Sequence, residues 1–371
     1  MSDEKPEAKP GQPSDRRSDQ SNDLPPAPVG SFASDNAAGV SPVVLEALVA
    51  ANHGPALAYG DDDWTRRAEA AWQERFDAPV VALPCWGGTG ANVVGIASVL
   101  RGWEGVIATD TAHVVVDECG ALSRFAGTQV STVPHHDGRL DPDDLEPFLH
   151  WQGSEHHVQP RVVSITQATE MGTLYTVDQI GEICDRAHSA GLLVHLDGAR
   201  IANALVATGS DLPTMIRDTG VDVMTVGLTK DGAMYGETVV HLRPELAEHA
   251  RFVRKQAGQL PSKARFVAAQ VLALLTDDLW LRNARHANEM AQLLAGAVGG
   301  IDGVTTQGEP EVNAVFAQLP AAAIVPLQEW SFFWEWDLTQ SLVRWMTSFA
   351  TTPDDVERFA AGVDAILARH R

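Results

Sequence analysis

The chain has 371 residues, of which 44% are hydrophobic and 20% are charged, and its formal net charge is −22 at pH 7. This composition is typical of a globular protein, and the length favours two domains. The strongly acidic balance argues against nucleic acid as a partner, and the lack of an uncharged apolar stretch of about 18 residues argues against a membrane span.

The N-terminal 30 residues are rich in proline, serine, aspartate and arginine, so we expect residues 1–30 to form a disordered tail. They contain no apolar run of the kind that a secretory signal needs. Ser41 and Pro42 then open an amphipathic run that predicts a helix, and Asp63–Phe76 predicts a second one. We expect residues 31–53 to pack against a small C-terminal domain.

Short apolar runs alternate with helical stretches through residues 54–285. Helices are predicted at Ala91–Leu100 and Val177–Ala190. Such alternation predicts an α/β domain with a large, doubly wound, mostly parallel sheet. The strand candidates are Val80–Leu83, Gly105–Thr109, Val130–Pro134, Val162–Thr166, Leu192–Leu196, Val221–Val226 and Thr238–Leu242.

A smaller α+β domain is predicted for residues 286–371. Arg265–Val298 predicts one or two long helices that lead into it. Its strand candidates are Ala314–Leu319, Trp330–Asp337 and Val343–Phe349. We interpret the aromatic run in the second of these as a buried strand rather than as a wall of a cofactor site.

The three cysteines, Cys85, Cys119 and Cys184, include no C-x-x-C pair. Their odd number argues against a disulfide framework and their spacing against a structural zinc site. We therefore expect a cytoplasmic protein that binds no metal.

A glycine-rich turn lies between a predicted strand and a predicted helix. Gly87, Gly88, Thr89 and Gly90 occupy this turn, where backbone N–H groups can bind a phosphate. The pattern is neither G-x-G-x-x-G nor a P-loop. A plain tight turn remains an equal alternative, and a dinucleotide site is a further one.

Asp197 ends the apolar strand of LLVHLDGAR, and the carboxyl ends of strands face the ligand crevice in open α/β sheets. A carboxylate there can pair with a protonated pyridine nitrogen, as pyridoxal-5′-phosphate (PLP) chemistry requires. The alternative is that Asp197 caps the following helix.

Lys230 is one of only five lysines and follows another apolar strand, in VDVMTVGLTKDG. A lysine buried at a strand end has a lowered pKa and is nucleophilic. An exposed turn lysine is the alternative. Together, a phosphate turn, a strand-end aspartate and a strand-end lysine suit one ligand that carries a phosphate, a pyridine nitrogen and an aldehyde.

From Ser31 onward the chain resembles the low-specificity L-threonine aldolases, which are fold type I PLP enzymes of the β-eliminating lyase group. The stretches that carry the resemblance are SDNAAGVSPVVLEAL, AYGDDDWT, GGTGAN, AHVVVDECGA, QPRVVSITQATEMGT, HLDGARIANA, GLTKDG and VRWMTSFATT. The SDNAAG form is similar to a phenylserine-aldolase-like branch.

The resemblance implies a role for each matching position. Lys230, preceded by Thr229, would bind the cofactor aldehyde as an imine, and Asp197 would pair with its ring nitrogen. The phosphate would lie against Gly88, Thr89 and Gly90, and His113 would stack on the ring. The remaining implied residues are Ser34, Arg200 and Arg344 at the substrate carboxylate, Arg200 also near the cofactor, Tyr59 near the site and His156 near the substrate hydroxyl.

The implied activity is cleavage of a β-hydroxy-α-amino acid, of the threonine, allo-threonine or phenylserine kind, to glycine and an aldehyde. Another PLP reaction such as β-elimination, or a PLP-binding protein with reduced or no turnover, remains open. Leu228 and Asp231 stand where the family usually has glycine and asparagine. A homodimer or homotetramer is also implied, and Arg254, Lys255, Lys263 and Arg265 are candidates to reach a neighbour's phosphate.

Overall fold

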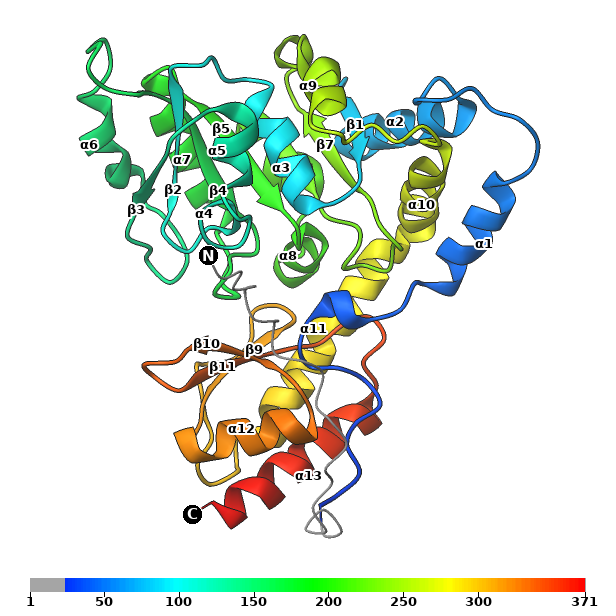
Figure 1. Ribbon diagram of the computed structural model, residues 1–371, viewed down its shortest axis with the longest axis vertical. Helices are drawn as coiled ribbons and strands as arrows, with labels where there is room; N and C mark the ends of the chain where they lie inside the picture. The colour runs from blue at the N-terminus through cyan, green and yellow to red at the C-terminus, as the bar shows by residue number, and fades with distance from the viewer. Residues whose placement is uncertain (1–23, 371) are drawn as a thin grey trace, which may run out of the picture.

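The computed structural model describes residues 24–370, and a seven-stranded sheet forms the centre of its larger part (Figure 1). The strand order is β1-β7-β6-β5-β4-β2-β3, and β7 alone runs antiparallel to its neighbours. The predicted mostly parallel sheet is therefore confirmed. The strands are β1 Val81–Cys85, β2 Glu104–Thr109, β3 Val130–Val133, β4 Gln159–Thr166, β5 Leu193–Gly198, β6 Val223–Val226 and β7 Glu237–His241.

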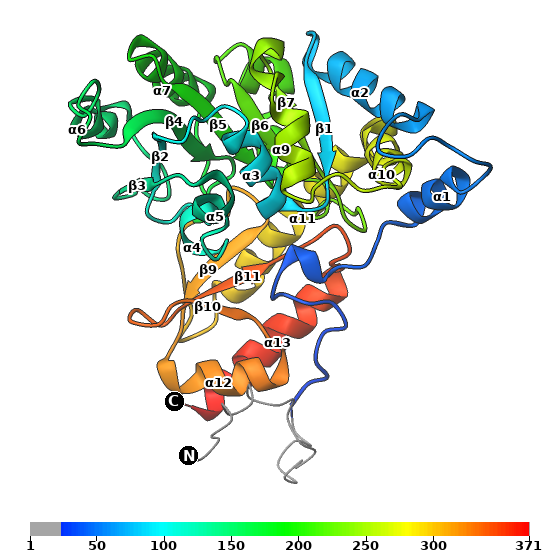
Figure 2. The ribbon, with the colours of Figure 1, turned by 45° about the horizontal axis from the view of Figure 1, so that its top comes forward.

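Helices cover both faces of this sheet (Figure 2). Successive strand residues point to opposite faces, so Val163 and Val194 lie in the core with α2, α7, α8 and α10, whereas Val162 and Leu193 lie in the core with α3 and α5. Burial on both faces explains why these strands read as continuous apolar runs. The helices are α2 Asp63–Phe76, α3 Gly88–Ala97, α4 His113–Val116, α5 Ala121–Ala126, α6 Glu146–Leu149, α7 Val177–Ser189, α8 Ile201–Thr208, α9 Ala250–Gln256 and α10 Arg265–Leu275.

The smaller part of the molecule is built on a four-stranded antiparallel sheet with the order β10-β11-β9-β8. Its core brings Phe333, Trp345 and Phe359 together with apolar side chains from the neighbouring helices. Its elements are β8 Thr305–Thr306, β9 Ala314–Gln318, α12 Ala321–Trp330, β10 Trp334–Asp337, β11 Leu342–Met346 and α13 Pro353–Arg369.

One helix, α11 (Leu279–Val298), belongs to both parts. Asn288 in its middle exchanges hydrogen bonds with Asn203 of α8, and Leu294 further along lies in the core of the smaller part. It is separated from α10 by Asp277 and Asp278, whose φ angles of 50° and 54° end a regular helix. The division at residues 285 and 286 thus falls inside a continuous helix and stays a prediction.

The N-terminal segment differs from its prediction. Residues 1–23 of the expected tail lie outside the described residues, whereas residues 24–30 are ordered: the Trp330 indole donates to the Pro25 carbonyl at 3.0 Å, and Gly30 N donates to Asp355 at 2.8 Å. Phe32 lies in the core of the smaller part, but α1 (Pro42–Ala51) packs on α10 of the larger part.

The aromatic run is the second difference. Trp330 ends α12 instead of opening a strand, and β10 begins only at Trp334. Phe333 is buried in the core of the smaller part, but Trp334 is 55% exposed, so the expectation of a buried aromatic strand is wrong for β10. This strand lies at the edge of its sheet, and its other residues are half-buried.

Candidate active site

Lys230 and Asp197 both lie at the carboxyl edge of the large sheet. Asp197 lies near the end of β5, directly beside Thr225 of the parallel strand β6, and Lys230 follows that strand after a short turn. Burial lowers the pKa of Lys230, and the positive charge of Arg200 lowers it further, while nearby carboxylates including Asp197 oppose the shift. A lysine with a lowered pKa is suited to nucleophilic attack on an aldehyde.

The turn that carries Lys230 is fixed by Glu237. This buried carboxylate, at the start of β7, accepts hydrogen bonds from Thr229 Oγ1 at 2.7 Å and from Leu228 N at 2.6 Å. Leu228 itself lies in the core, so its bulk is absorbed there. Asp231 is also buried, and its Oδ2 has no hydrogen-bond partner within residues 24–370; burial raises its pKa well above the usual range.

A chain of hydrogen bonds leads from Asp197 to His113. Asn92 Nδ2 donates to Asp197 Oδ2 at 2.7 Å and to Glu118 Oε1 at 2.9 Å, and the same Glu118 oxygen accepts from His113 Nδ1 at 2.9 Å. The bond to Glu118 raises the pKa of His113. Because a carboxylate can only accept, the imidazole donates from Nδ1 and leaves Nε2 free to act on a ligand.

The glycine turn forms the start of α3, which begins at Gly88, three residues before the predicted helix. The first-turn N–H groups of a helix have no partner within it and bind anions. The carboxamide of Gln259 lies against this turn and accepts from Trp86 N at 3.1 Å. A Cβ atom on Gly90 would lie 2.1 Å from the Gln259 Cδ atom, so a larger residue there would displace the carboxamide from the turn.

Arg200 is held by an acidic residue of the N-terminal segment. Its guanidinium donates to both oxygens of the buried Asp35, at 2.7 and 3.1 Å. Although burial alone would raise it, the charges of Arg200 and Lys230 lower the pKa of Asp35 to about 2. Ser34 precedes Asp35, and its hydroxyl accepts from Asn36 N. Two of the Arg200 nitrogen atoms, Nε and Nη2, are thus already engaged by Asp35.

Arg344 on β11 is in the opposite situation. Its Nε is buried and has no hydrogen-bond partner among residues 24–370, and its guanidinium stacks on Trp336 at 4.7 Å. Burial lowers its pKa to about 10. It lines a cavity of about 540 Å³ together with Asp110, Thr111, Val116, Asp117, Trp334, Glu335 and Trp336. An unpaired guanidinium at a cavity is suited to binding a carboxylate.

Glu170 adds a carboxyl group that sequence reasoning did not single out. It follows β4, and its Oε1 accepts from His113 N and from Thr166 Oγ1, both at 2.9 Å. Its Oε2 is buried without a partner, and burial raises the pKa of Glu170 to about 7. A carboxyl group in this state can exchange a proton near neutral pH.

Two expected site residues lie elsewhere in this chain. His156 is exposed in the loop before β4, at the amino edge of the sheet, whereas Lys230 lies at the carboxyl edge. Tyr59 lies beside the segment after α9, where its N–H donates to Ser262 and Lys255 lies over its ring. Within one chain neither residue is placed with Lys230 and Asp197.

The basic residues near α9 also differ from expectation. Arg254 is buried and donates to the Pro84 carbonyl, and Arg265 donates to the Gly54 carbonyl at 2.8 Å. Both guanidinium groups therefore have partners in their own chain. Lys255 and Lys263 remain on the surface.

Several residues of the site were missed although they stand inside the quoted stretches. Asn92 follows the glycine turn in GGTGAN, Glu118 lies in AHVVVDECGA, and Glu170 lies in QATEMG. Their position within stretches shared with the aldolases could have marked them as candidate site residues. Gln259 lay outside all of them, and only the fold brings it to Gly90.

Within the described part of the chain, no group of three histidine, cysteine, aspartate or glutamate side chains is arranged to hold a metal ion. Among the same residues no helix is long and apolar enough to cross a membrane.

Comparison with known proteins adds an independent finding. Residues 31–322 match the family described as beta-eliminating lyase. The chain is 37% identical to the low specificity L-threonine aldolase of a Pseudomonas species, over 91% of this chain and 98% of that protein. It is also 37% identical to the corresponding protein of Pseudomonas aeruginosa, over 91% and 97%. The solved threonine aldolase structure of Leishmania major matches with a TM-score of 0.84 and 31% identity, over 91% of this chain and 99% of that one.

Proposed function

This chain belongs to the beta-eliminating lyase family, and on that premise we propose that it is a PLP-dependent aldolase. It cleaves β-hydroxy-α-amino acids of the threonine, allo-threonine or phenylserine kind to glycine and an aldehyde. The observation that carries the proposal is the half-buried Lys230 at the same edge of the sheet as Asp197, to which Asn92 of the glycine-turn helix is hydrogen-bonded.

The residues present fit the cofactor. The Lys230 amine would bind its aldehyde carbon, Asp197 would accept from its ring nitrogen, and the N–H groups that follow Gly87 would bind its phosphate. His113 lies on the same hydrogen-bond chain as Asp197 and would contact the ring. When bound, PLP supplies an acceptor for the electron pair that the broken Cα–Cβ bond leaves on Cα.

The substrate carboxylate binds Arg344. Arg344 is better suited to this than Arg200, because its guanidinium has no acidic partner among residues 24–370, whereas Arg200 already binds Asp35. Arg200 and Ser34, which both lie next to Asp35, complete the carboxylate site. Fixing the carboxylate sets the orientation of the other Cα bonds, including the one to be broken.

The proton of the β-hydroxyl group passes to His113. Its Nδ1 is held by Glu118, so its Nε2 faces the ligand as an acceptor. Glu170, which has a pKa of about 7 and accepts from the His113 backbone, exchanges the proton with the surroundings. The raised pKa of His113 favours its protonated form after the transfer, and Glu170 can hold a proton near neutral pH.

The protein assembles as a homodimer or homotetramer and acts in the cytoplasm. Apolar side chains on and after α1 are exposed in the single chain, with Val49 68% and Leu57 72% exposed, and this supports assembly. The described cysteines are all free, which supports a reducing compartment. Light scattering on the purified protein measures the size of the assembly.

The test is a comparison of the wild-type protein with Lys230→Ala and with Lys9→Ala as a matched control. We expect the wild type and the control to give a borohydride-sensitive absorbance band with PLP and to release glycine and aldehyde from threonine. Lys230→Ala should give neither. A normal band and full cleavage in Lys230→Ala would overturn the proposal, and ammonia without glycine would favour β-elimination instead.

A further inference from the structure

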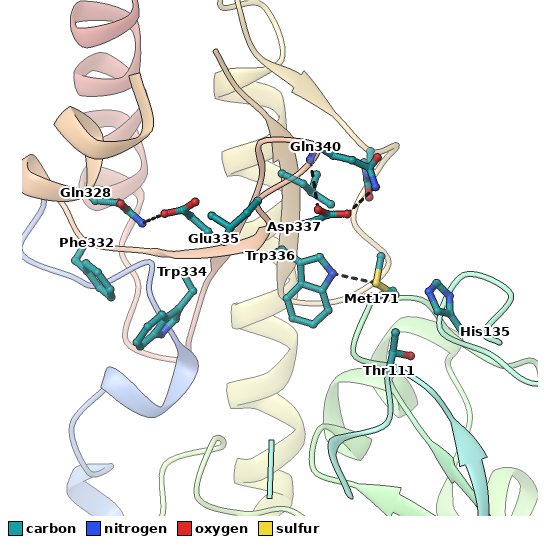
Figure 3. A pocket seen from close by; sticks show the side chains of 13 residues that line it. Thr111, His135, Met171, Gln328, Phe332, Trp334, Glu335, Trp336, Asp337 and Gln340 are labelled. Atoms are coloured by element: carbon teal, nitrogen blue, oxygen red, sulfur yellow. Dashed lines mark hydrogen bonds between the residues drawn. The ribbon is translucent and has the colours of Figure 1, made fainter. Parts of the chain in front are cut away.

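Aromatic side chains gather on the side of β10 that faces the larger part of the molecule (Figure 3). Phe332 and Trp334 are 50% and 55% exposed, and their rings meet edge to face at 5.0 Å. Trp336 lies at a register shift between Glu335 and Asp337, and it lines the same cavity as Trp334. Large exposed aromatic side chains at a cavity are typical of a ligand contact.

This aromatic group is directly joined to the carboxylate site. Trp334 and Arg344 are cross-strand partners on β10 and β11, so their side chains leave the sheet next to each other. Trp336 lies under the Arg344 guanidinium, and its indole N–H donates to Met171 Sδ at 3.2 Å, which fixes the ring (Figure 3). Trp334 makes no such hydrogen bond to the described residues, and it lines the cavity with 55% of its surface exposed.

The rest of the cavity selects by charge. Val116 and Thr111 offer apolar atoms across from the two tryptophans, while Asp110, Asp117 and Glu335 place negative charge around them. Apart from the substrate carboxylate that Arg344 binds, an anionic group in this cavity would be repelled by these three carboxylates. The cavity therefore suits a flat, uncharged, apolar group.

We infer that Trp334 is a specificity-determining residue that binds an aromatic β-substituent of the substrate and so favours aryl over methyl. The inference rests on the proposed function. The β-carbon of an α-amino acid is attached to the same carbon as its carboxylate. With the carboxylate on Arg344, the β-substituent lies next to the cross-strand neighbour of that arginine, where a ring can stack on or meet the indole edge to face.

The experiment compares kcat/KM for phenylserine and for threonine in the PLP-loaded protein. Trp334→Ala should lower the value for phenylserine about tenfold, the loss expected for one aromatic contact. The value for threonine should stay within about twofold. Trp334→Phe, which keeps an aromatic face, should retain most of the preference. Trp103→Ala is the matched control, because Trp103 is also exposed, at 61%, but lies before β2 at the other edge of the sheet.

A second readout does not depend on cleavage. L-Phenylalanine and L-2-aminobutyrate lack the β-hydroxyl group, so both act only as competitive inhibitors. Trp334→Ala should raise the inhibition constant of L-phenylalanine alone. Equal effects on aryl and alkyl compounds, or no effect on either, would overturn the inference. A wild-type protein that cleaves neither amino acid would instead overturn the proposed function.

Discussion

Asn92 joins two carboxylates through a single nitrogen atom: its Nδ2 donates to Asp197 at 2.7 Å and to Glu118 at 2.9 Å. The amide thus lies between two buried carboxyl groups, that of Asp197 at the proposed cofactor site and that of Glu118, which holds His113. Without it, the two carboxylates would lie in a buried site with no shared donor.

Asn92→Ala should therefore lower both stability and cofactor affinity. Removing the donor leaves the buried Asp197 Oδ2 without its hydrogen bond and Glu118 Oε1 with His113 Nδ1 alone, and we expect a loss of about 1–3 kcal/mol in the free energy of unfolding. Urea denaturation and PLP titration measure the two effects. Asn52→Ala, at an exposed position after α1, is the control. Unchanged PLP affinity in Asn92→Ala would contradict a role for this network at the cofactor.

Gln259→Ala should weaken the binding of PLP but not of pyridoxal, which lacks the phosphate. The carboxamide lies against Gly90 at the start of α3, where its Nε2 can donate to an anion. We expect about a tenfold rise in the dissociation constant for PLP, measured by absorbance titration. A parallel loss for pyridoxal would mean that Gln259 acts on the shape of the whole site instead.

Arg200→Met and Arg344→Met form a matched pair with opposite outcomes. Arg200→Met leaves the buried Asp35 carboxylate without its guanidinium partner, so we expect a loss of about 3–5 kcal/mol in the free energy of unfolding. Arg344→Met removes a guanidinium without an acidic partner, so the loss should stay below about 1 kcal/mol. Its KM for threonine should rise about a hundredfold. Chemical denaturation measures the loss of stability in each variant, and initial rates measure KM. Similar stability losses in the two variants would contradict the different roles of Arg200 and Arg344.

Asp231→Asn should stabilise the protein, and more so at higher pH. Burial raises the pKa of Asp231, so the stability linked to its protonated form is fully present below the unfolded value near 3.8 and is lost as pH rises through the folded value. Asparagine does not ionise and avoids that loss. Melting curves at pH 5 and pH 8 measure the difference between variant and wild type. A difference that shrinks with pH would show that the carboxylate has a partner in solution.

Local pattern was enough to predict most of the large sheet. Its strands are apolar because both faces are covered, and Asp197 and Lys230 stand out because each is a polar residue at the end of such a strand. The sequence also predicted a helix at the glycine turn, although that helix begins at Gly88, inside the turn. These features depend on neighbours along the chain, which a sequence shows directly.

What the sequence could not show depends on contacts between distant segments. Asp35 meets Arg200, and Gln259 meets Gly90, only because the fold brings them together. Trp334 was expected to be buried, since aromatic side chains usually are, but its strand borders the cavity and not the core. His156 was assigned by resemblance, and its place at the amino edge follows from where β4 begins.

The helix α11 has a consequence for how the site responds to distant changes. A regular helix of 20 residues is a rod about 30 Å long, and this one is anchored by Asn288 in one core and by Leu294 in the other. A hinge between the two cores would have to break it. The helix therefore fixes the distance between the part that carries Lys230 and the part that carries Arg344. A substitution that weakens the packing of either end of α11 would change that distance and so lower the rate, even far from any ligand.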